Sequence, residues 1–415
     1  MNILLIHQNF PGQFRHLAWR LQQDGLHKVL AIGKEGCPGL PGVDVLTYRT
    51  HRPVAKETHH YVRGFESGVI HGQAVMRLLL QLRSRGFIPD VVVAHPGWGE
   101  TLFVKDIFPA CKLVHLCEYY YHSVGVDLDF DPEFPATLDD RARIRARNAL
   151  QLLNLEHSDV AIAPTQWQKS LFPKAYQAKI KVVHEGIKVE DLGPDPQACF
   201  KLPNGRVLKA GEPVVTYVSR NLEPYRGFHC FVRALPSLLE RHPQCEVVIV
   251  GGDDVSYGRR PEGAPNWREK MLKEVRLDPA RVHFTGAIAY AEYCKLLQVS
   301  AAHVYLTYPF VLSWSMLEAM ASGCLVIGSR TPPVEEVLID GFNGLLVDFF
   351  DGTQIVDTIL HALEQPAESQ SLRQRARETV RERYGLEGAM SSYLAEITAG
   401  DGLASPAGTK LRTTA

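Results

Sequence analysis

Two arginines in the second half of the chain have the placement of a phosphate-binding pair. Arg220 and Arg226 flank a loop that leaves a predicted strand and enters a predicted helix. Guanidinium groups form paired, charge-assisted hydrogen bonds with phosphate oxygens, and α/β sheets bind ligands at the carboxyl ends of their strands. We therefore predict that Arg220 and Arg226 bind a diphosphate. Two solvated surface arginines are the alternative.

A second candidate anion site lies farther along the chain, where Ser313 and Trp314 open another predicted helix. Free backbone amides at the N-terminus of a helix attract phosphate oxygens. Glu318 lies in the same helix, and its spacing allows two roles. Its carboxylate could bind ribose hydroxyls, as acidic residues do in dinucleotide sites, or it could close a capping box with Ser315.

Gly12 lies in the turn that follows the first predicted strand. A glycine at this place lets backbone amides approach a ligand, and the helix that follows favours an anion. A tight turn without a ligand explains Gly12 equally well. The turn lacks the glycine fingerprint of NAD-binding proteins, which argues against a dehydrogenase.

Short apolar runs that alternate with helical patterns must position these residues. Strands are predicted at 3–7, 28–32, 90–94, 112–117, 159–163 and 181–184, and again at 214–219, 246–250, 282–285, 303–306, 325–328 and 345–347. Continuously apolar strands joined by helices indicate a parallel sheet covered on both faces. The sequence therefore predicts an α/β protein with two Rossmann-like, doubly wound domains that face each other across a cleft.

The boundaries of these domains follow from breaks in the pattern. The first domain is predicted over 1–190 and the second over 213–370, with a linker rich in proline and glycine over 191–212. Helices over 371–399 are expected to pack back on the first domain. The tail 400–415 is rich in Gly, Ser and Thr, and we expect it to be disordered.

The composition of the 415 residues excludes several classes of function. A net charge of -1 gives no bulk attraction to nucleic acid. The chain shows no secretory signal, no run long enough to span a membrane and no CxxC pair among its eight cysteines. We expect a cytoplasmic protein. The basic stretches 77–85 and 141–147 are expected to be solvated, with peripheral contact to the anionic inner face of the membrane as the alternative.

Four segments resemble the family 4 retaining glycosyltransferases of GT-B fold: 220–227, 284–286, 317–328 and 341–348. The resemblance implies transfer of a sugar from a nucleotide-sugar donor to a carbohydrate, lipid-linked or small-molecule acceptor in polysaccharide or glycoconjugate biosynthesis. It implies neither a cofactor nor a metal ion. A sugar-nucleotide epimerase of the same fold and an inactive nucleotide-sugar binding protein are the alternatives.

The resemblance also implies roles for individual residues. Arg220 and Arg226 would hold the donor diphosphate, with Gly12 beside the phosphates and Glu318 on the ribose. Thr285 and Gly286 would meet the base, and the amides around Ser313 and Trp314 would also contact phosphate. Glu118 stands where many relatives have a histidine near the reacting sugar, so it could orient hydroxyls or stabilise positive charge at the anomeric carbon; a hydrogen-bonded strand end is the alternative. The candidate acceptor or sugar contacts are His95, Trp98, His115, His122 and Phe310.

Three positions depart from the pattern of the family. Arg226 replaces the usual lysine, Ser313 replaces a glycine, and Phe310 replaces the first glutamate of the signature. That glutamate commonly contacts the transferred sugar in relatives. Phe310 therefore leaves the recognition of the donor sugar open.

Overall fold

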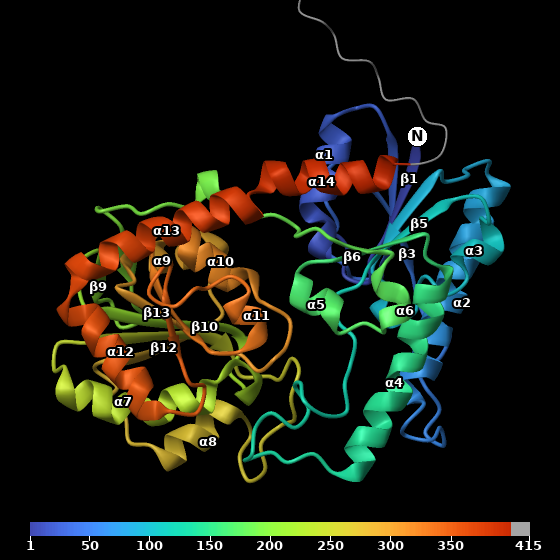
Figure 1. The fold of residues 1–415 in the computed structure, drawn as a ribbon. Coiled ribbons are helices and arrows are strands. Elements are labelled where there is room, and N and C mark those ends of the chain that lie inside the picture. Colours follow the sequence, from blue (N-terminus) through green and yellow to red (C-terminus); the bar gives the residue numbers. More distant parts are fainter. Residues whose placement is uncertain (400–415) are drawn as a thin grey trace, which may run out of the picture.

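Two α/β domains form most of the structure, a computed structural model that describes residues 1–399 (Figure 1). The tail predicted over 400–415 lies outside the described residues. The N-terminal domain contains a sheet of seven parallel strands in the order β3-β2-β1-β4-β5-β6-β7. Its strands are β1 (Asn2–Ile6), β2 (Lys28–Lys34), β3 (Asp44–Tyr48), β4 (Val91–Ala94), β5 (Lys112–Leu116), β6 (Val160–Ala163) and β7 (Ile180–Val182).

Sequence reasoning found six of these strands and missed β3. The missed strand lies at the edge of the sheet, and most of its residues are exposed or half-buried. An edge strand of this kind lacks the continuous apolar run that marks the central strands. The helices of this domain are α1 (Arg15–Gln23), α2 (Arg63–Ser84), α3 (Val104–Ile107), α4 (Leu138–His157), α5 (Gln166–Ser170) and α6 (Lys174–Gln177).

The C-terminal domain repeats the arrangement with six parallel strands in the order β12-β11-β10-β13-β14-β15. All six were predicted. They are β10 (Val214–Asn221), β11 (Glu246–Gly252), β12 (Val282–Gly286), β13 (Ala302–Tyr305), β14 (Leu325–Ser329) and β15 (Leu345–Val347). The helices of this domain are α7 (Phe228–Arg241), α8 (Trp267–Glu274), α9 (Tyr290–Val299), α10 (Trp314–Ala321), α11 (Pro332–Glu335) and α12 (Gly352–Glu364).

The interval 191–212, which was expected to be a linker, contains a small antiparallel hairpin of β8 (Cys199–Lys201) and β9 (Val207–Lys209). The side chains of Phe200 and Leu208 are buried against Val248 and Leu296 of the C-terminal domain. This part of the interval therefore packs with the C-terminal domain, and the proline and glycine residues belong to its turns.

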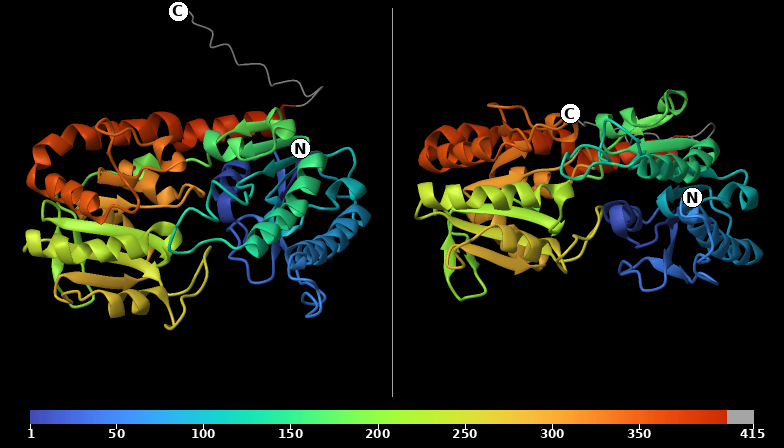
Figure 2. Two further views of the ribbon diagram at one scale, coloured as in Figure 1. Left: turned by 60° about the horizontal axis from the view of Figure 1, so that its bottom comes forward. Right: turned by 90° about the horizontal axis from the view of Figure 1, so that it is seen from below.

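Two C-terminal helices span both domains along one side of the molecule (Figures 1 and 2). The first, α13 (Pro366–Tyr384), packs on α10 and β14 of the C-terminal domain. Only the second, α14 (Leu386–Thr398), returns to the N-terminal domain, where Met390 and Tyr393 join the cluster around Leu17. The backbone amide of Ile187 donates to the carbonyl oxygen of Tyr384, and the carbonyl oxygen of Ile187 accepts from the amide of Leu386, so the two crossings between the domains lie side by side.

Each sheet has one point where the strand order reverses, between β1 and β4 in the first domain and between β10 and β13 in the second. Ligands bind at such switch points in open α/β sheets, at the carboxyl ends of the strands. The loops that follow these four strands carry Gly12, His95, Arg226 and Phe310. Within residues 1–399, no helix is both long and apolar enough to cross a bilayer.

Candidate active site between the domains

The turn after β1 holds Gly12 directly against a buried histidine. Gly12 has a φ of +46°, and a Cβ atom on it would lie 2.2 Å from the imidazole of His7. Only glycine accepts this contact. His7 Nε2 lies 2.7 Å from Gln13 Oε1, and burial lowers the pKa of His7 to about 4. The imidazole is therefore neutral near pH 7 and serves to fix the turn.

Glu118 lies beside this turn, directly after β5. Its carboxylate accepts a hydrogen bond from Gln13 Nε2 at 3.0 Å and lies 3.4 Å from His95 Nε2. Burial favours a raised pKa for Glu118, but the contacts with His95 and Gln13 outweigh it, and the pKa lies below its usual value. The ring of His95 stacks on Trp98 at 4.4 Å. The structure thus brings Glu118, His95 and Trp98 together, and the carboxylate is 30% exposed.

Two histidines predicted near this place do not join the group. His115 lies inside the sheet on β5 and is fully buried, which lowers its pKa to about 3. The prediction that His115 contacts acceptor or sugar is therefore wrong, because the pleat of the strand directs its side chain into the interior. His122 is half-buried, and its Nε2 lies 2.7 Å from the carbonyl oxygen of Leu171. This bond anchors the loop after β5 to the end of α5.

Both predicted arginines line a small cavity of about 70 Å³ at the carboxyl end of β10. We call it the donor cavity, and its walls are Val218, Ser219, Arg220, Asn221, Glu223, Arg226, Tyr257, Tyr305, Ser313 and Ser315. Arg220 is exposed at its mouth. Arg226 is buried, and its Nη1 donates to the Tyr305 hydroxyl at 3.1 Å and the Thr307 hydroxyl at 2.7 Å. The alternative of two solvated arginines is therefore wrong for Arg226.

The loop opposite Arg226 is held by a buried carboxylate that sequence reasoning missed. Glu223 has no exposed surface, and its two oxygens accept hydrogen bonds from the backbone amides of Ser256, Tyr257 and Gly258 at 2.8–3.3 Å. An acidic residue directly before Pro224 in a ligand-binding loop is the only local signal for it. These bonds place the Tyr257 ring 5.4 Å from the guanidinium carbon of Arg226.

The helix α10 begins two residues earlier than the capping-box alternative requires. Ser313 is the N-cap, and its hydroxyl accepts a hydrogen bond from the amide of Ser315. The carboxylate of Glu318 instead accepts hydrogen bonds from the hydroxyls of Tyr290 at 2.9 Å and Tyr293 at 3.0 Å. The capping-box alternative is therefore wrong. Glu318 is half-buried, and burial raises its pKa.

Thr285 and Gly286 lie at the carboxyl end of β12, on the edge of the sheet. The Thr285 hydroxyl donates to the carbonyl oxygen of Gly286 at 3.1 Å, and a Cβ atom on Gly286 would meet no atom within 4 Å. Both residues therefore border open space on the same side of the sheet as Glu318 and the donor cavity.

Phe310 lies in an aromatic cluster that joins the two domains. Its ring packs on Tyr119 at 4.6 Å, on Tyr257 at 4.8 Å and on Tyr225 at 5.5 Å. Tyr119 belongs to the N-terminal domain, and its hydroxyl donates to the carbonyl oxygen of Pro309 at 3.1 Å. Phe310 is thus buried by tyrosines from both domains, and any contact it makes with a sugar is through the edge of this cluster.

Residues 119–136, which we call the bridging segment, leave the N-terminal sheet after β5 and pack on the C-terminal domain. Phe130 lies 5.1 Å from the ring of Tyr308. The buried carboxylate of Asp131 accepts a hydrogen bond from the Tyr308 hydroxyl at 2.6 Å and lies 2.9 Å from His229 Nε2. Sequence reasoning missed this segment because each of its residues is ordinary by itself and gains its role from a contact far along the chain.

The two walls of the cleft also meet at the crossing between the domains. Trp314, the first residue of α10, donates through its indole nitrogen to the carboxyl group of Glu185 at 3.4 Å. Glu185 is buried, and burial together with the negative charge of Glu118 raises its pKa to about 7. The contact between Trp314 and Glu185 therefore links the start of α10 to the chain segment near Glu118.

Family models match the chain in two successive blocks. A model described as the glycosyl transferase family 4 group matches residues 25–192, and a model described as glycosyl transferases group 1 matches residues 201–379. The chain belongs to the family 4, group 1 glycosyltransferases.

Relatives of known name belong to the same group. A GDP-mannose-dependent alpha-(1-6)-phosphatidylinositol monomannoside mannosyltransferase of Mycolicibacterium smegmatis is 26% identical over 230 residues, 53% of this chain and 57% of that protein. The chain spans just over half the length of this and two further curated relatives. Glycogen synthase of Mycobacterium tuberculosis is 24% identical over 91% of this chain and 90% of its own length.

Solved structures of two glycosyltransferase-type proteins share the fold. Sucrose-phosphate synthase of Thermosynechococcus elongatus superposes with a TM-score of 0.71 at 18% identity, covering 95% of this chain and 98% of that one. HepE of Anabaena, solved in complex with UDP-glucose, gives a TM-score of 0.67 at 16% identity, covering 95% of this chain and 100% of that one. At this identity the likeness establishes the GT-B fold.

One group of metal-ligating side chains occurs among the described residues of this family member. Ligand atoms of Asp131, Glu133 and His229 lie within 4.8 Å of one another. Arg233 donates to both oxygens of Glu133 at 2.6 and 3.0 Å, and Tyr308 donates to Asp131. A cation at this place would have to displace Arg233, and the group belongs to the contact of the bridging segment, outside the walls of the donor cavity.

Proposed function

We propose that this protein transfers a sugar from a nucleotide-sugar donor to an acceptor, with retention of anomeric configuration and without a metal ion. The observation that carries the proposal is the donor cavity, where Arg220, buried Arg226 and the N-cap residue Ser313 converge. All three favour the negative charge of a diphosphate. Membership of the glycosyltransferase family and the names of its relatives support the same activity.

The charge arrangement supports loss of a nucleoside diphosphate. When the bond between the anomeric carbon and the diphosphate oxygen breaks, the negative charge on the departing diphosphate increases. Arg220, Arg226 and the amides at the start of α10 stabilise this charge where it develops. These groups supply the positive charge that a divalent cation supplies elsewhere, which is the basis for proposing metal independence.

Retention of configuration follows in this proposal from attack on the face that the diphosphate leaves. The acceptor hydroxyl oxygen forms the new bond to the anomeric carbon, and the hydroxyl proton passes to an oxygen of the departing diphosphate. Glu118, charged because its pKa lies below the usual value, would orient a hydroxyl or stabilise positive charge at the anomeric carbon. Its lateral contacts with Gln13 and His95 hold the carboxylate in one position.

The test is a turnover assay of the full chain with UDP-, GDP-, ADP- and dTDP-sugars in the presence and absence of acceptors. We expect nucleoside diphosphate release that depends on acceptor and survives EDTA, with the anomeric configuration of the product read by NMR. Loss of activity in EDTA that manganese restores would contradict metal independence, and an inverted product would contradict retention. Epimerised donor without transfer would favour an epimerase, and binding without turnover would favour an inactive nucleotide-sugar binding protein.

A further inference from the structure

A second and much larger cavity, of about 850 Å³, lies between the two domains. We call it the interdomain cavity. The bridging segment and the first turns of α4 form its N-terminal wall, and the loop 256–262 with the start of α8 forms its C-terminal wall. Neither domain could enclose it alone. Cavities of this size hold substrates of the size of a small glycan or a drug-like molecule.

The interdomain cavity adjoins the donor cavity. Tyr257 lines both. Tyr225 and Phe310, which pack near Tyr257, line the interdomain cavity beside the loop that carries Arg226. The two cavities therefore share a wall at Tyr257, whose ring lies 5.4 Å from the guanidinium carbon of Arg226. Two substrates of one transfer reaction must occupy neighbouring sites.

Aromatic rings form much of the wall. Tyr121 and Phe134 come from the bridging segment, and Tyr257 and Trp267 come from the C-terminal domain. The faces of aromatic rings carry partial negative charge and attract the weakly positive C–H groups on the face of a sugar ring. A wall of this composition suits a cyclic, hydroxylated molecule more than an extended apolar one.

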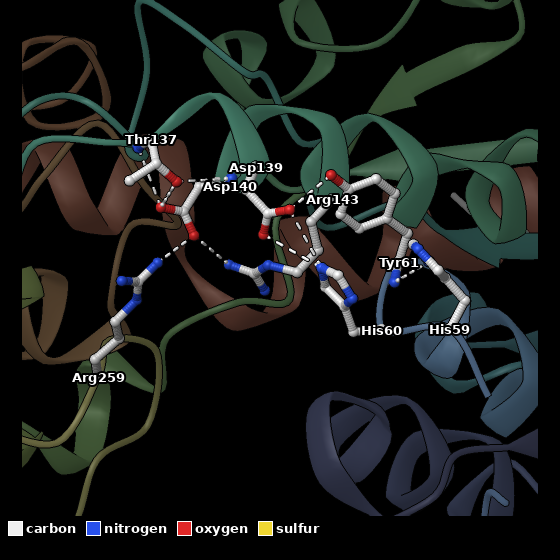
Figure 3. Close-up of polar contacts among 8 residues, drawn as sticks. All are labelled: His59, His60, Tyr61, Thr137, Asp139, Asp140, Arg143 and Arg259. Atoms are coloured by element: carbon white, nitrogen blue, oxygen red, sulfur yellow. Dashed lines mark hydrogen bonds and ion pairs between the residues drawn. The ribbon is translucent and has the colours of Figure 1, made fainter. Parts of the chain in front are cut away.

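Two cations in the wall lack a carboxylate partner. The guanidinium of Arg147 lies 4.0 Å from the centre of the Tyr121 ring, and the ammonium of Lys270 lies 5.2 Å from the Trp267 ring. Neither forms an ion pair with any of residues 1–399. Two more cations, Arg143 of α4 and Arg259 of the opposite wall, converge on the single carboxylate of Asp140 (Figure 3). The fifth cation of the wall, Arg260, pairs with Asp254, so Arg147 and Lys270 are the wall cations without an ion pair among the described residues.

The acidic groups of the wall are mostly occupied by other partners. Asp131 contacts His229, and Glu133 contacts Arg233. Asp127 accepts hydrogen bonds from the hydroxyls of two tyrosines, and burial raises its pKa. Glu262 is the remaining acidic residue, and it lies exposed at the rim. An anion in the cavity would meet Arg147 and Lys270, which form no ion pair with the described residues, and at Arg147 it would compete with the nearby carboxyl group of Asp127.

We propose that the interdomain cavity binds the acceptor and selects one that carries an anionic group, a phosphate or a carboxylate, next to a sugar-like ring. The proposal rests on the proposed transferase function, whose acceptor it assigns to a chemical class. The ring stacks on the aromatic wall, and the anionic group forms ion pairs with Arg147 and Lys270. Both cations already lie against aromatic rings, so an ion pair with them holds the anion beside the stacking surface.

The test is calorimetric titration of the full chain with three soluble probes: glucose 6-phosphate, glucuronate and glucose. We expect both charged probes to bind at least about tenfold more tightly than glucose, in line with a charged hydrogen bond. The double variant Arg147→Gln/Lys270→Gln should lose this preference and keep its affinity for nucleoside diphosphate. The matched control is Arg145→Gln, because Arg145 is an exposed arginine of the same helix that does not line the cavity.

The outcomes separate this proposal from the proposed function. Equal binding of charged and neutral probes, no binding of charged probes at millimolar concentration, or loss of nucleoside diphosphate affinity in the double variant would overturn it. Sugar transfer to neutral acceptors alone would overturn it and leave the transferase function intact. Selective binding of charged probes without any transfer would contradict the transferase function but would support the proposed site for an anionic group. Vesicles of phosphatidylinositol in phosphatidylcholine, compared with the soluble probes, tell whether a lipid carries the anionic group.

Discussion

The donor cavity and the interdomain cavity share the side chain of Tyr257 but are built in different ways. The donor cavity is formed within one domain, by loops at the switch point of a single sheet. The interdomain cavity needs the bridging segment, α4 and the loop 256–262, which come from both domains. Donor binding should therefore persist when the contact between the domains loosens, whereas acceptor binding and turnover should not. Each of the following changes breaks or sharpens that contrast.

The largest effect is expected from Glu118→Gln, which removes the charge of the side chain beside His95 and keeps its shape. Turnover should fall by about a hundredfold, as it does when a preorganised electrostatic contact is lost, while donor affinity stays close to that of the unmodified chain. A paired measurement of kcat and of donor affinity by calorimetry checks this. Because the contacts with His95 and Gln13 hold the pKa of Glu118 below its usual value, the acid limb of the pH–rate profile that this carboxylate produces should lie at a lower pH than for an ordinary glutamate.

His115, which lies outside the site, provides the control variant for Glu118. His115 is buried in the neighbouring strand and contacts neither wall. The variant His115→Asn should leave donor affinity unchanged, and it should leave kcat unchanged when kcat is counted per folded molecule. Weakened donor binding in Glu118→Gln would show that the two walls are not separable.

Arg226→Ala should weaken binding of nucleoside diphosphate by about tenfold to a hundredfold, because a charged hydrogen bond contributes about 1.5–3 kcal/mol. The melting temperature should also fall, since the buried side chain donates to the hydroxyls of Tyr305 and Thr307. Arg220→Ala, at the exposed mouth of the same cavity, should weaken binding with no change in melting temperature. Unchanged diphosphate affinity in both variants would refute the assignment of the donor cavity.

Glu318→Gln should reduce donor affinity by about tenfold with a melting temperature close to that of the unmodified chain. The amide oxygen still accepts a hydrogen bond from one tyrosine hydroxyl, and the amide nitrogen donates to the other hydroxyl. The variant loses the charge that strengthens bonds to two ribose hydroxyls. Donor titration and thermal unfolding on the same samples measure both quantities. Tyr290→Phe, which removes one neighbour of the carboxylate and leaves its charge, is the matched control. Normal donor binding in Glu318→Gln would leave this carboxylate with a structural role only.

The smallest effect is expected from Asp131→Asn in the bridging segment. The change weakens the contacts with His229 and Tyr308 by about 1 kcal/mol. It should lower the melting temperature of the protein by about 2–4 °C. Nucleoside diphosphate affinity should not change, because the donor cavity lies within one domain. Calorimetric unfolding with and without nucleoside diphosphate makes the measurement. A loss of donor affinity equal to that of Arg226→Ala would show that the donor cavity also depends on the bridging segment.

Much of the fold is predictable because its signals are local. Buried parallel strands are continuous apolar runs, and twelve of the thirteen strands in the two large sheets were predicted. The missed strand, β3, lies at an edge and has exposed or half-buried residues at four of its five positions. Residues that directly follow such strands lie at a known end of the sheet. From this rule alone, Arg226 and Ser313 are expected near one ligand and Glu118 near His95. In the structure Arg226 and Ser313 line one cavity, and Glu118 lies beside His95.

Tertiary structure decided what strand ends cannot specify, namely which way a side chain points and which distant residue meets it. His115 and Glu118 are three residues apart, yet the pleat buries the first in the sheet and the end of the strand leaves the second at the cleft. The sequence allowed Glu318 to be a helix cap, and only the position of Tyr290 and Tyr293 decided its partners. The sequence predicted a cleft between the domains but not which side chains line the interdomain cavity, because its walls are adjacent only after two separately folded domains dock. Contacts of that kind depend on the docking geometry of whole domains, and no short-range pattern in a chain encodes it.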